Sequence, residues 1–322
     1  MFAVTGVGSD PVDPLRHLRF DERPIPRPAP GWTTVTVRAT SLNRHDLWML
    51  QGSRRQVHDG PRVLGSDAAG IDNHGVEVIV LPVIGDPRAG DGDETLDPDR
   101  GILGDDRDGT FAQHVTVPTR NLVTKPPSLS WEYAACLPGA WLTAYRMLFD
   151  RVDLPEAARV LVQGAGGGVA TALITLGSAA GHRMWVTSRS AERRRRALRL
   201  GAEAVFEPDA RLPDRVDAVM ETVGAATWTH SLRAVRSGGH IVVSGATSGL
   251  EASTHLGHVF FRQIHITGST LGTRAHLVDL VRFVTRHGLR PAIDRVTPLA
   301  DARAGFRALL DGEVFGKVVF VP

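Results

Sequence analysis

Short runs of alternating apolar and polar residues dominate the first 127 positions of the chain. The clearest are residues 32–40 (WTTVTVRAT), 76–83 (VEVIVLPV) and 111–118 (FAQHVTVP), and Pro and Gly punctuate the stretches between them. Alternation with period two, bounded by turn residues, is typical of half-buried strands joined by hairpins. We therefore expect a mostly antiparallel β domain, in which the acidic, turn-rich segment 85–109 forms either a surface loop or a partly mobile lobe.

From Ser130 onward the pattern changes to apolar residues at helical spacing, followed by short apolar runs that alternate with helical stretches. This alternation predicts βαβ units and a doubly wound parallel sheet, so the fold class is α/β. Beyond about Val284 the pattern predicts a loop, a helix over 300–310 and a final strand, KVVFV.

Composition and charge narrow the class of protein. The 322 residues are 42% hydrophobic and 22% charged, a balance typical of globular proteins. Lys and Arg number 37 against 35 Asp and Glu, so no excess of positive charge favours nucleic acid or an anionic membrane as partner. The single cysteine, Cys136, excludes an internal disulfide and any zinc site with two cysteine ligands. No signal peptide or membrane span is indicated, so we expect a cytoplasmic protein.

A glycine-rich turn between a predicted strand and a predicted helix is the most informative local motif. The strand at 159–163 runs into GAGGGVA, residues 164–170. The strict G-x-G-x-x-G pattern fails from Gly164, but one position later the register becomes A-x-G-G-x-A. Small residues let backbone N–H groups approach a pyrophosphate at the helix N-terminus, so the turn predicts a dinucleotide site. The candidate contacts are Ala165, Gly167, Gly168 and Val169.

The residues about twenty positions later indicate which dinucleotide is bound. A site for NAD(H) places an acidic residue at the end of the second strand, but this chain has SRSAERRRR at 188–196. Guanidinium groups bind phosphate well, so the sequence favours NADP(H) as the cofactor. Ser188, Arg189 and Arg193 are the candidates for the ribose phosphate, and the later arginines also fit a solvated helix face.

Further motifs are spread in order over nearly the whole chain. They include SLNRHDLWMLQG (41–52), LGSDAAG (64–70), GTFAQHVTVP (109–118), LPGAWLTAYRML (137–148), ETVG (221–224), GGHIVVSGATSG (238–249) and the closing GKVVF. Together with the glycine-rich turn, these motifs resemble the medium-chain dehydrogenase/reductase superfamily, and in particular its zinc-independent quinone oxidoreductase-like branch.

The resemblance implies a domain organisation and a set of cofactor contacts. A GroES-like catalytic domain would comprise residues 1–127 and 285–322, a Rossmann domain residues 128–284, and cofactor and substrate would bind between them. A homodimer joined along the strand near 265–269 is also implied. By motif position, the resemblance places further contacts with NADP(H) on Thr143, Thr222, Val223, Ser244, Gly245, Ala246, Ser269, Thr270 and Lys317.

Zinc-dependent members of the superfamily hold the catalytic metal at positions that correspond here to Asn43, Ser66 and Gly139. None of these residues is a good zinc ligand, so we expect no metal. Without a Lewis acid, conjugate reduction is easier than alcohol oxidation, because ordinary hydrogen-bond donors stabilise the resulting enolate. The leading hypothesis is an NADPH-dependent, zinc-independent reductase of quinones or α,β-unsaturated carbonyl compounds. A metal-free alcohol dehydrogenase and a catalytically weak NADPH-binding interaction protein are the alternatives.

The motif at 41–52 contains the catalytic candidates Asn43, His45 and Asp46. The amide of Asn43 can donate to a carbonyl or order the nicotinamide ribose, and His45 can act as a donor or proton relay. His45 and Asp46 also fit structural roles, Asp46 as a loop cap. Trp48 stands where many relatives have tyrosine, and the lack of a tyrosyl proton donor argues against an enoyl-thioester reductase.

Overall fold

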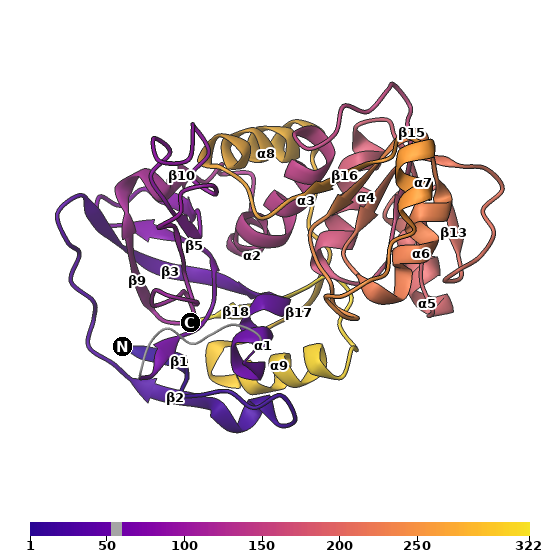
Figure 1. Ribbon diagram of the computed structural model, residues 1–322. Coiled ribbons are helices and arrows are strands. Elements are labelled where there is room, and N and C mark those ends of the chain that lie inside the picture. The colour runs from indigo at the N-terminus through magenta and orange to yellow at the C-terminus, as the bar shows by residue number, and fades with distance from the viewer. Residues whose placement is uncertain (53–59) are drawn as a thin grey trace. The chain divides into compact units, whose positions relative to one another are not determined.

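The computed structural model describes residues 1–52 and 60–322, and the chain separates into two compact units. Unit 1 comprises Met1–Leu142 and Leu271–Pro322, and unit 2 comprises Thr143–Thr270 (Figure 1). Helix α8 (Arg274–His287) belongs with unit 1, where the Arg274 backbone N–H donates to Glu94. The boundaries expected from the sequence, which place this helix in the Rossmann domain, stay a prediction.

Unit 1 is organised around a sheet in which nearly every strand pairing is antiparallel. Within the described residues, the strand order is β10 (Leu122–Thr124), β6 (Glu77–Val80), β5 (Asp67–Asp72), β3 (Trp32–Leu42), β18 (Lys317–Val321) and β17 (Ile293–Pro298), and β9 (His114–Pro118) also pairs with β3. Among the described strands of this sheet, only β17 and β18 run parallel to each other. The predicted mostly antiparallel β domain is confirmed.

The prediction of a plain loop between Val284 and the helix near residue 300 is wrong, because β17 lies there. Its side chains are half-buried or exposed and form no apolar run, so the local pattern does not identify a strand. The strand is held by its register with β18, in which Val296 lies opposite Val319.

Smaller elements complete unit 1. They are β1 (Phe2–Gly6), β2 (Leu18–Glu22), β4 (Arg62–Val63), β7 (Val83–Ile84), β8 (Gly101–Ile102), α1 (Arg44–Gln51), α2 (Trp131–Ala135) and α9 (Ala302–Leu310), the 3-10 turns η1 (Pro14–His17), η2 (Thr119–Asn121) and η4 (Leu299–Asp301), and a π-helical turn, η3 (Leu137–Trp141). Phe111, in the loop before β9, packs edge-on against Phe306 of α9 and Phe320 of β18. The loop, the helix and the strand therefore share one buried core.

Unit 2 is a parallel sheet with a reversal in its strand order. The order is β13 (Ala204–Phe206), β12 (Arg183–Thr187), β11 (Arg159–Val162), β14 (Val216–Glu221), β15 (Val235–Val243) and β16 (His265–Gly268), and all pairings are parallel. Numbered along the chain this is 3-2-1-4-5-6, the order of a Rossmann fold, so the predicted doubly wound sheet is confirmed.

Right-handed crossovers between these strands determine which face of the sheet each helix of unit 2 covers. Helices α4 (Gly168–Ala179) and α5 (Ala191–Arg199) lie on one face, and α6 (Ala225–Ala234) and α7 (Leu256–Phe261) on the other (Figure 1). Helix α3 (Leu142–Phe149) leads into the unit. Among the helices of the described residues, none is both long and apolar enough to cross a lipid bilayer.

Candidate active site

Asn43 follows β3 directly and precedes the first turn of α1. Its backbone N–H donates to Asp46 Oδ2 at 2.7 Å, so the carboxylate caps the start of the helix and fixes the position of Asn43. Asp46 is fully buried, and its Oδ1 has no hydrogen-bond partner among the described residues. Burial raises the pKa of Asp46 to about 6. The structure therefore gives Asp46 a capping role, and its catalytic role stays a prediction.

His45 lies beside the acidic segment that the sequence assigns to the surface. Its Nε2 is 3.5 Å from Asp105 Oδ2, and both side chains are largely covered. The contact orients the imidazole ring toward a carboxylate of unit 1. Its role as a proton relay stays a prediction.

Lys317 brings a buried positive charge to Asn43. At the start of β18, its Nζ donates to Asn43 Oδ1 at 2.5 Å and to Asp67 Oδ2 at 3.1 Å. Lys317 is 2% exposed and Asp67 is fully buried. Ser41 Oγ also donates to Asp67 Oδ2, at 2.7 Å. A buried ion pair needs such additional hydrogen bonds to offset desolvation, so the three β strands that supply these residues hold one another in register.

The π-helical turn η3 places Gly139 against the same group of residues. A Cβ on residue 139 would lie 2.5 Å from Asp67 Oδ1 and 3.0 Å from Asn43 Nδ2. The Nδ2 group itself donates to Ser66 Oγ at 3.2 Å. Glycine therefore lets this turn pack closely against Asp67 and the Asn43 amide, and π-helical turns often occur at functional sites. Local sequence patterns did not reveal this turn.

The three positions that the resemblance aligns with zinc ligands thus lie together, but their side chains do not fit the metal. They provide an amide, a hydroxyl and no side chain at all, and the amide oxygen already accepts from the Lys317 ammonium. Burial raises the pKa of the Cys136 thiol to about 12, so the only cysteine offers no thiolate. In residues 1–52 and 60–322 no three His, Cys, Asp or Glu side chains are grouped to hold a metal ion.

In unit 2 the glycine-rich turn joins β11 to α4 as expected. Gly164 has a φ of +84°, a conformation that favours glycine, and Gly167 is the N-cap of α4. A Cβ on Gly167 would meet nothing within 4 Å, so its backbone is open to an approaching ligand. Ala165 is buried, whereas Gly168 and Val169 form the first residues of the helix. The geometry is that of an anion site at a helix N-terminus.

Arg193, in the first turn of the arginine-rich helix α5, lies next to this glycine-rich turn. A Cβ on Gly166 would lie 2.9 Å from Arg193 Nε, so that guanidinium lies against the turn. Arg189 is exposed after β12. Two neighbours are engaged elsewhere: Arg194 donates to the Ser188 carbonyl and to Glu207, and Arg195 pairs with Glu192.

A buried polar network, which the motif analysis missed, joins the carboxyl ends of three adjacent strands. Thr187 donates to Gln163, Gln163 Nε2 donates to Ser231 Oγ, and Ser231 donates to Glu221 Oε2, at 2.6, 3.0 and 2.6 Å. Glu221 Oε1 also accepts from the backbone N–H groups of residues 223 and 224 and from the Thr227 hydroxyl. One carboxylate therefore shapes the loop after β14. A glutamate at the end of an apolar strand is the signal that could have identified it.

The remaining residues predicted to contact the cofactor lie mainly at the carboxyl ends of the parallel strands. Thr222 and Val223 follow β14, Ser244, Gly245 and Ala246 follow β15, and Ser269 and Thr270 follow β16. Thr143 lies in α3. Buried Arg146, also in α3, donates to the Thr270 carbonyl at 3.1 Å and so holds that strand end. Lys317 differs from this set, because it lies in unit 1 with Asn43.

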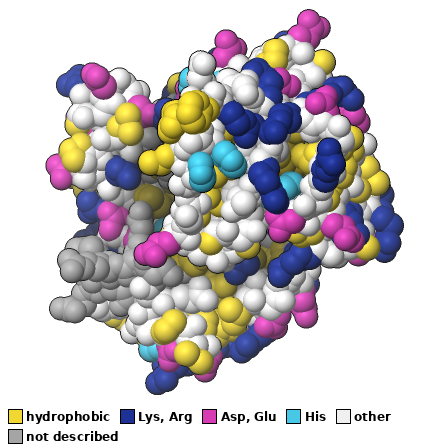
Figure 2. All heavy atoms as spheres, turned by 45° about the vertical axis from the view of Figure 1, so that its right-hand side comes forward, with side chains coloured by type: hydrophobic (Ala, Val, Ile, Leu, Met, Phe, Trp, Pro, Cys, Tyr) yellow, Lys and Arg dark blue, Asp and Glu magenta, His cyan; other side chains and the backbone are white. Residues whose placement is uncertain are grey.

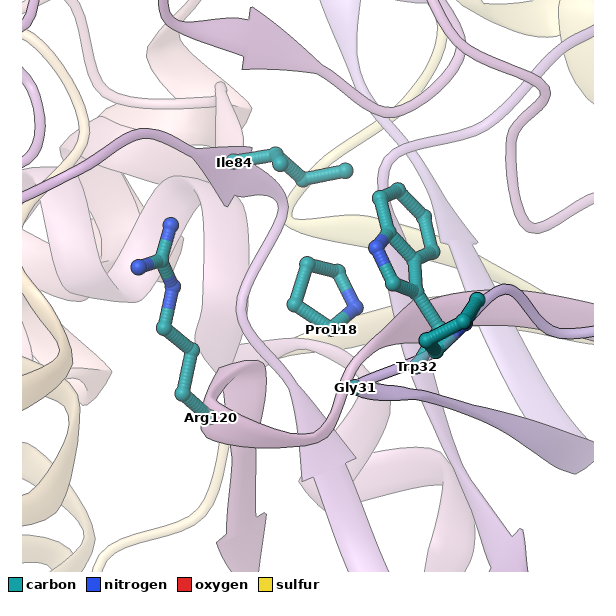
Figure 3. Close-up of a pocket in the computed structure, with 6 residues that line it drawn as sticks. Gly31, Trp32, Ile84, Pro118 and Arg120 are labelled. Carbon is teal, nitrogen blue, oxygen red and sulfur yellow. The ribbon is translucent and has the colours of Figure 1, made fainter.

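A surface pocket lies at the opposite end of β3 from Asn43. It measures about 340 Å³ and is lined by Pro30, Gly31, Trp32, Ile84, Pro118 and Arg120. Figure 3 shows Trp32, Ile84 and Arg120 arranged around Pro118. Arg120 is occupied by the Gly85 carbonyl, and we assign no chemistry to this pocket.

Comparisons with known proteins match both units. Residues 29–127 match the alcohol dehydrogenase GroES-like domain, and residues 168–286 match the zinc-binding dehydrogenase family. An acryloyl-coenzyme A reductase of Metallosphaera sedula is 28% identical over 91% of this chain and 93% of its own length. The structure of an NAD-dependent alcohol dehydrogenase is 33% identical, with a TM-score of 0.91 over 100% of both chains. A 2-octenoyl-CoA carboxylase reductase, solved with NADP and 2-octenoyl-CoA, is 25% identical, with a TM-score of 0.87 over 99% of this chain and 87% of its own.

Proposed function

Because this chain belongs to the medium-chain dehydrogenase/reductase superfamily, we propose that it is an NADP(H)-dependent oxidoreductase that reduces α,β-unsaturated carbonyl compounds without a catalytic metal ion. The observation that carries the proposal is the hydrogen bond from the Lys317 ammonium to Asn43 Oδ1, at a position that the family resemblance aligns with a zinc ligand.

NADP(H) is the cofactor that the turn and its surroundings fit. The N-terminus of α4 offers backbone N–H groups to a pyrophosphate, and Arg193 lies against Gly166 of the turn. No carboxylate stands directly after β12 to accept from a ribose hydroxyl or to repel a ribose phosphate. The similar 2-octenoyl-CoA carboxylase reductase was solved with NADP, which supports the same assignment here.

A conjugated carbonyl is the substrate class that suits a site without a Lewis acid. When bound, NADPH would supply a hydride to the β-carbon, and the C=C electron pair would move toward the carbonyl oxygen. The resulting enolate needs a hydrogen-bond donor on its oxygen, which Asn43 Nδ2 can provide, and a proton at its α-carbon, which water can provide. The acryloyl-coenzyme A reductase among the relatives supports enoyl thioesters within this class, despite Trp48 in place of tyrosine. Quinones, favoured by the sequence motifs, remain part of the proposal.

Alcohol oxidation is the second candidate, because the similar structure with 33% identity is an NAD-dependent alcohol dehydrogenase. That reaction requires a hydroxyl group to lose its proton. The amide, hydroxyl and glycine at the metal positions of this chain do not lower a hydroxyl pKa as a zinc ion does. Conjugate reduction is therefore the better fit.

The test is NADPH oxidation, followed by near-ultraviolet absorbance, with an enone, an enoyl thioester, a quinone and an aldehyde, each with and without a chelator. We expect turnover of at least one conjugated substrate, unchanged by the chelator. Turnover of the aldehyde alone, or loss of activity on chelation, would contradict the proposal. Tight NADPH binding with no turnover would favour the interaction-protein alternative.

A homodimer formed through unit 2 is part of the proposed function. Strand β16 is the last strand of its sheet, and an edge strand offers unpaired backbone groups to another strand. Exposed apolar side chains lie on β16 and α7 beside it: Ile266 is 43%, Phe260 61% and Phe261 81% exposed. Figure 2, which turns unit 2 toward the viewer, shows exposed hydrophobic side chains interspersed with arginine and histidine. A second copy of the chain would cover this edge.

The cytoplasmic location expected from the sequence also stays a prediction.

A further inference from the structure

Asn43 and Ser66, which the resemblance aligns with zinc ligands, are joined by a hydrogen bond in this chain, and Asn43 also accepts from Lys317. We propose that Lys317 is a positioning residue, which turns the Asn43 amide so that Nδ2 donates to the carbonyl oxygen of the substrate. This inference rests on the proposed function and deepens it, because it names the group that replaces the Lewis acid.

The chemistry of the ammonium group determines the orientation of the amide. A lysine ammonium carries three donors and no acceptor, so the atom of Asn43 that faces it must be the oxygen. The observed contact, Nζ to Oδ1 at 2.5 Å, meets this condition. Turning the amide over would place its NH2 group against the ammonium and lose the hydrogen bond from Nδ2 to Ser66 Oγ. One orientation is therefore strongly favoured.

Asp67 and Ser41 keep Lys317 in place. Asp67 Oδ2 accepts from Nζ at 3.1 Å and from Ser41 Oγ at 2.7 Å, and Asp67 itself is fully buried. In such surroundings a charged donor polarises the amide to which it is bonded, which strengthens the opposite N–H groups as donors. Lys317 thus acts on the substrate only through Asn43.

The Asn43 amide has one donor left for a substrate. Of the two Nδ2 hydrogens, one is used by Ser66, and in the described part of the chain the other has no partner. Asn43 is half-buried, so its amide is not fully enclosed. A Cβ on residue 139 would lie 2.5 Å from Asp67 Oδ1 and 3.0 Å from Nδ2, so a larger residue there would press on this donor. The remaining Nδ2 hydrogen is the single donor that we propose for the substrate oxygen.

Two variants test the proposal in the full-length protein. Asn43→Asp replaces the amide by a carboxylate, which pairs with Lys317 but cannot donate. We expect kcat to fall about 100-fold, the usual effect of losing one oxyanion donor, while the dissociation constant for NADPH changes little. The double variant Asp67→Asn/Lys317→Met removes the ion pair without stranding a buried charge, and we expect kcat to fall about 10-fold because the amide is no longer held in one orientation. Wild-type kcat in the folded double variant would overturn the proposal.

Lys125→Met is the matched control. Lys125 is also buried, at 5% exposure, and also forms an ion pair in unit 1, with Glu77 at 2.8 Å, but it does not touch Asn43. We expect it to lower stability and to keep kcat and the KM for the carbonyl substrate. An equal loss of kcat in Lys125→Met and in the double variant would reduce Lys317 to a structural role and overturn the proposal.

A readout independent of turnover separates this inference from the proposed function. The side-chain amide signals of Asn43 in ¹H–¹⁵N spectra are identified by their absence in Asn43→Asp. We expect their hydrogen exchange to be slow in the wild type and faster in the double variant. If no substrate of the panel reacts but this difference is found, the orientation by Lys317 stands and the proposed function fails. If a conjugated substrate reacts and the exchange is unchanged, the proposed function stands and the inference fails.

Discussion

The Arg193 guanidinium lies against Gly166 in the glycine-rich turn, where a Cβ would come within 2.9 Å of its Nε. The first turn of α5 and the glycine-rich turn before α4 are therefore in contact. The contact places a fixed positive charge at the carboxyl edge of the sheet, next to the end of β12 where a ribose phosphate would lie.

Arg193→Ala should weaken NADPH binding selectively. Losing a charge-assisted hydrogen bond to phosphate should raise the KM for NADPH about 10- to 100-fold, and the KM for NADH should change little. Arg189→Ala should act in the same direction. Steady-state kinetics with both nucleotides measure the ratio.

Arg195→Ala is the control, because its guanidinium pairs with Glu192 on the exposed face of α5. It should leave both KM values unchanged. An equal rise for NADPH and NADH in Arg193→Ala would contradict the assignment of the phosphate.

Local patterns were sufficient to predict the parts of the fold that depend on neighbours in the sequence. Apolar runs marked the strands of the parallel sheet, and the glycine-rich turn and the arginines after β12 identified its carboxyl edge. Right-handed crossovers then leave few possible strand orders.

Contacts between distant residues could not be predicted in this way. Lys317 and Asn43 are 274 residues apart, and the family motif alone placed Lys317 among the cofactor contacts. The network around Glu221 depends on three strands that meet only in the folded sheet. Strand β17 was missed because its pairing with β18, not its own apolar residues, holds it in place.

Glu221→Ala should destabilise the protein and disturb the loop after β14, which is predicted to contact the cofactor. The backbone N–H groups of residues 223 and 224 and the hydroxyls of Thr227 and Ser231 would lose a buried acceptor. We expect the free energy of unfolding in urea to fall by about 3 kcal/mol and the dissociation constant for NADPH to rise. The control is Glu251→Ala, at an exposed carboxylate, which should change neither the free energy of unfolding nor the dissociation constant for NADPH. Unchanged stability in Glu221→Ala would show that this network does not hold the loop.

Phe261→Ser/Ile266→Lys should convert the proposed dimer into a monomer. The two substitutions remove exposed apolar surface and place a charge on the edge strand, which opposes pairing with a second copy. Light scattering after size-exclusion chromatography measures the mass. Val12→Lys, at a position 90% exposed in unit 1, is the control and should keep the wild-type mass. A wild-type protein that is monomeric, or a double variant that stays dimeric, would rule out this interface.

Ionisation of the Asp46 carboxyl group should make the protein less stable as the pH rises from 4 to 7. Its pKa rises from 3.8 to about 6 because burial disfavours the charged carboxylate. Between these values the unfolded chain loses its proton first, so ionisation favours unfolding; above the higher value the whole cost, about 3 kcal/mol, is present.

Asp46→Asn keeps an oxygen to accept from the Asn43 backbone N–H and removes the ionisation. Relative to the wild type, the free energy of unfolding of this variant should therefore increase by about 2 kcal/mol between pH 4 and pH 7, as measured by urea denaturation at each pH. Asp311→Asn, at an exposed carboxylate of the same unit, should show no such trend. A difference between Asp46→Asn and wild type that stays constant over this range would mean that Asp46 ionises as an ordinary carboxylate, which its complete burial argues against.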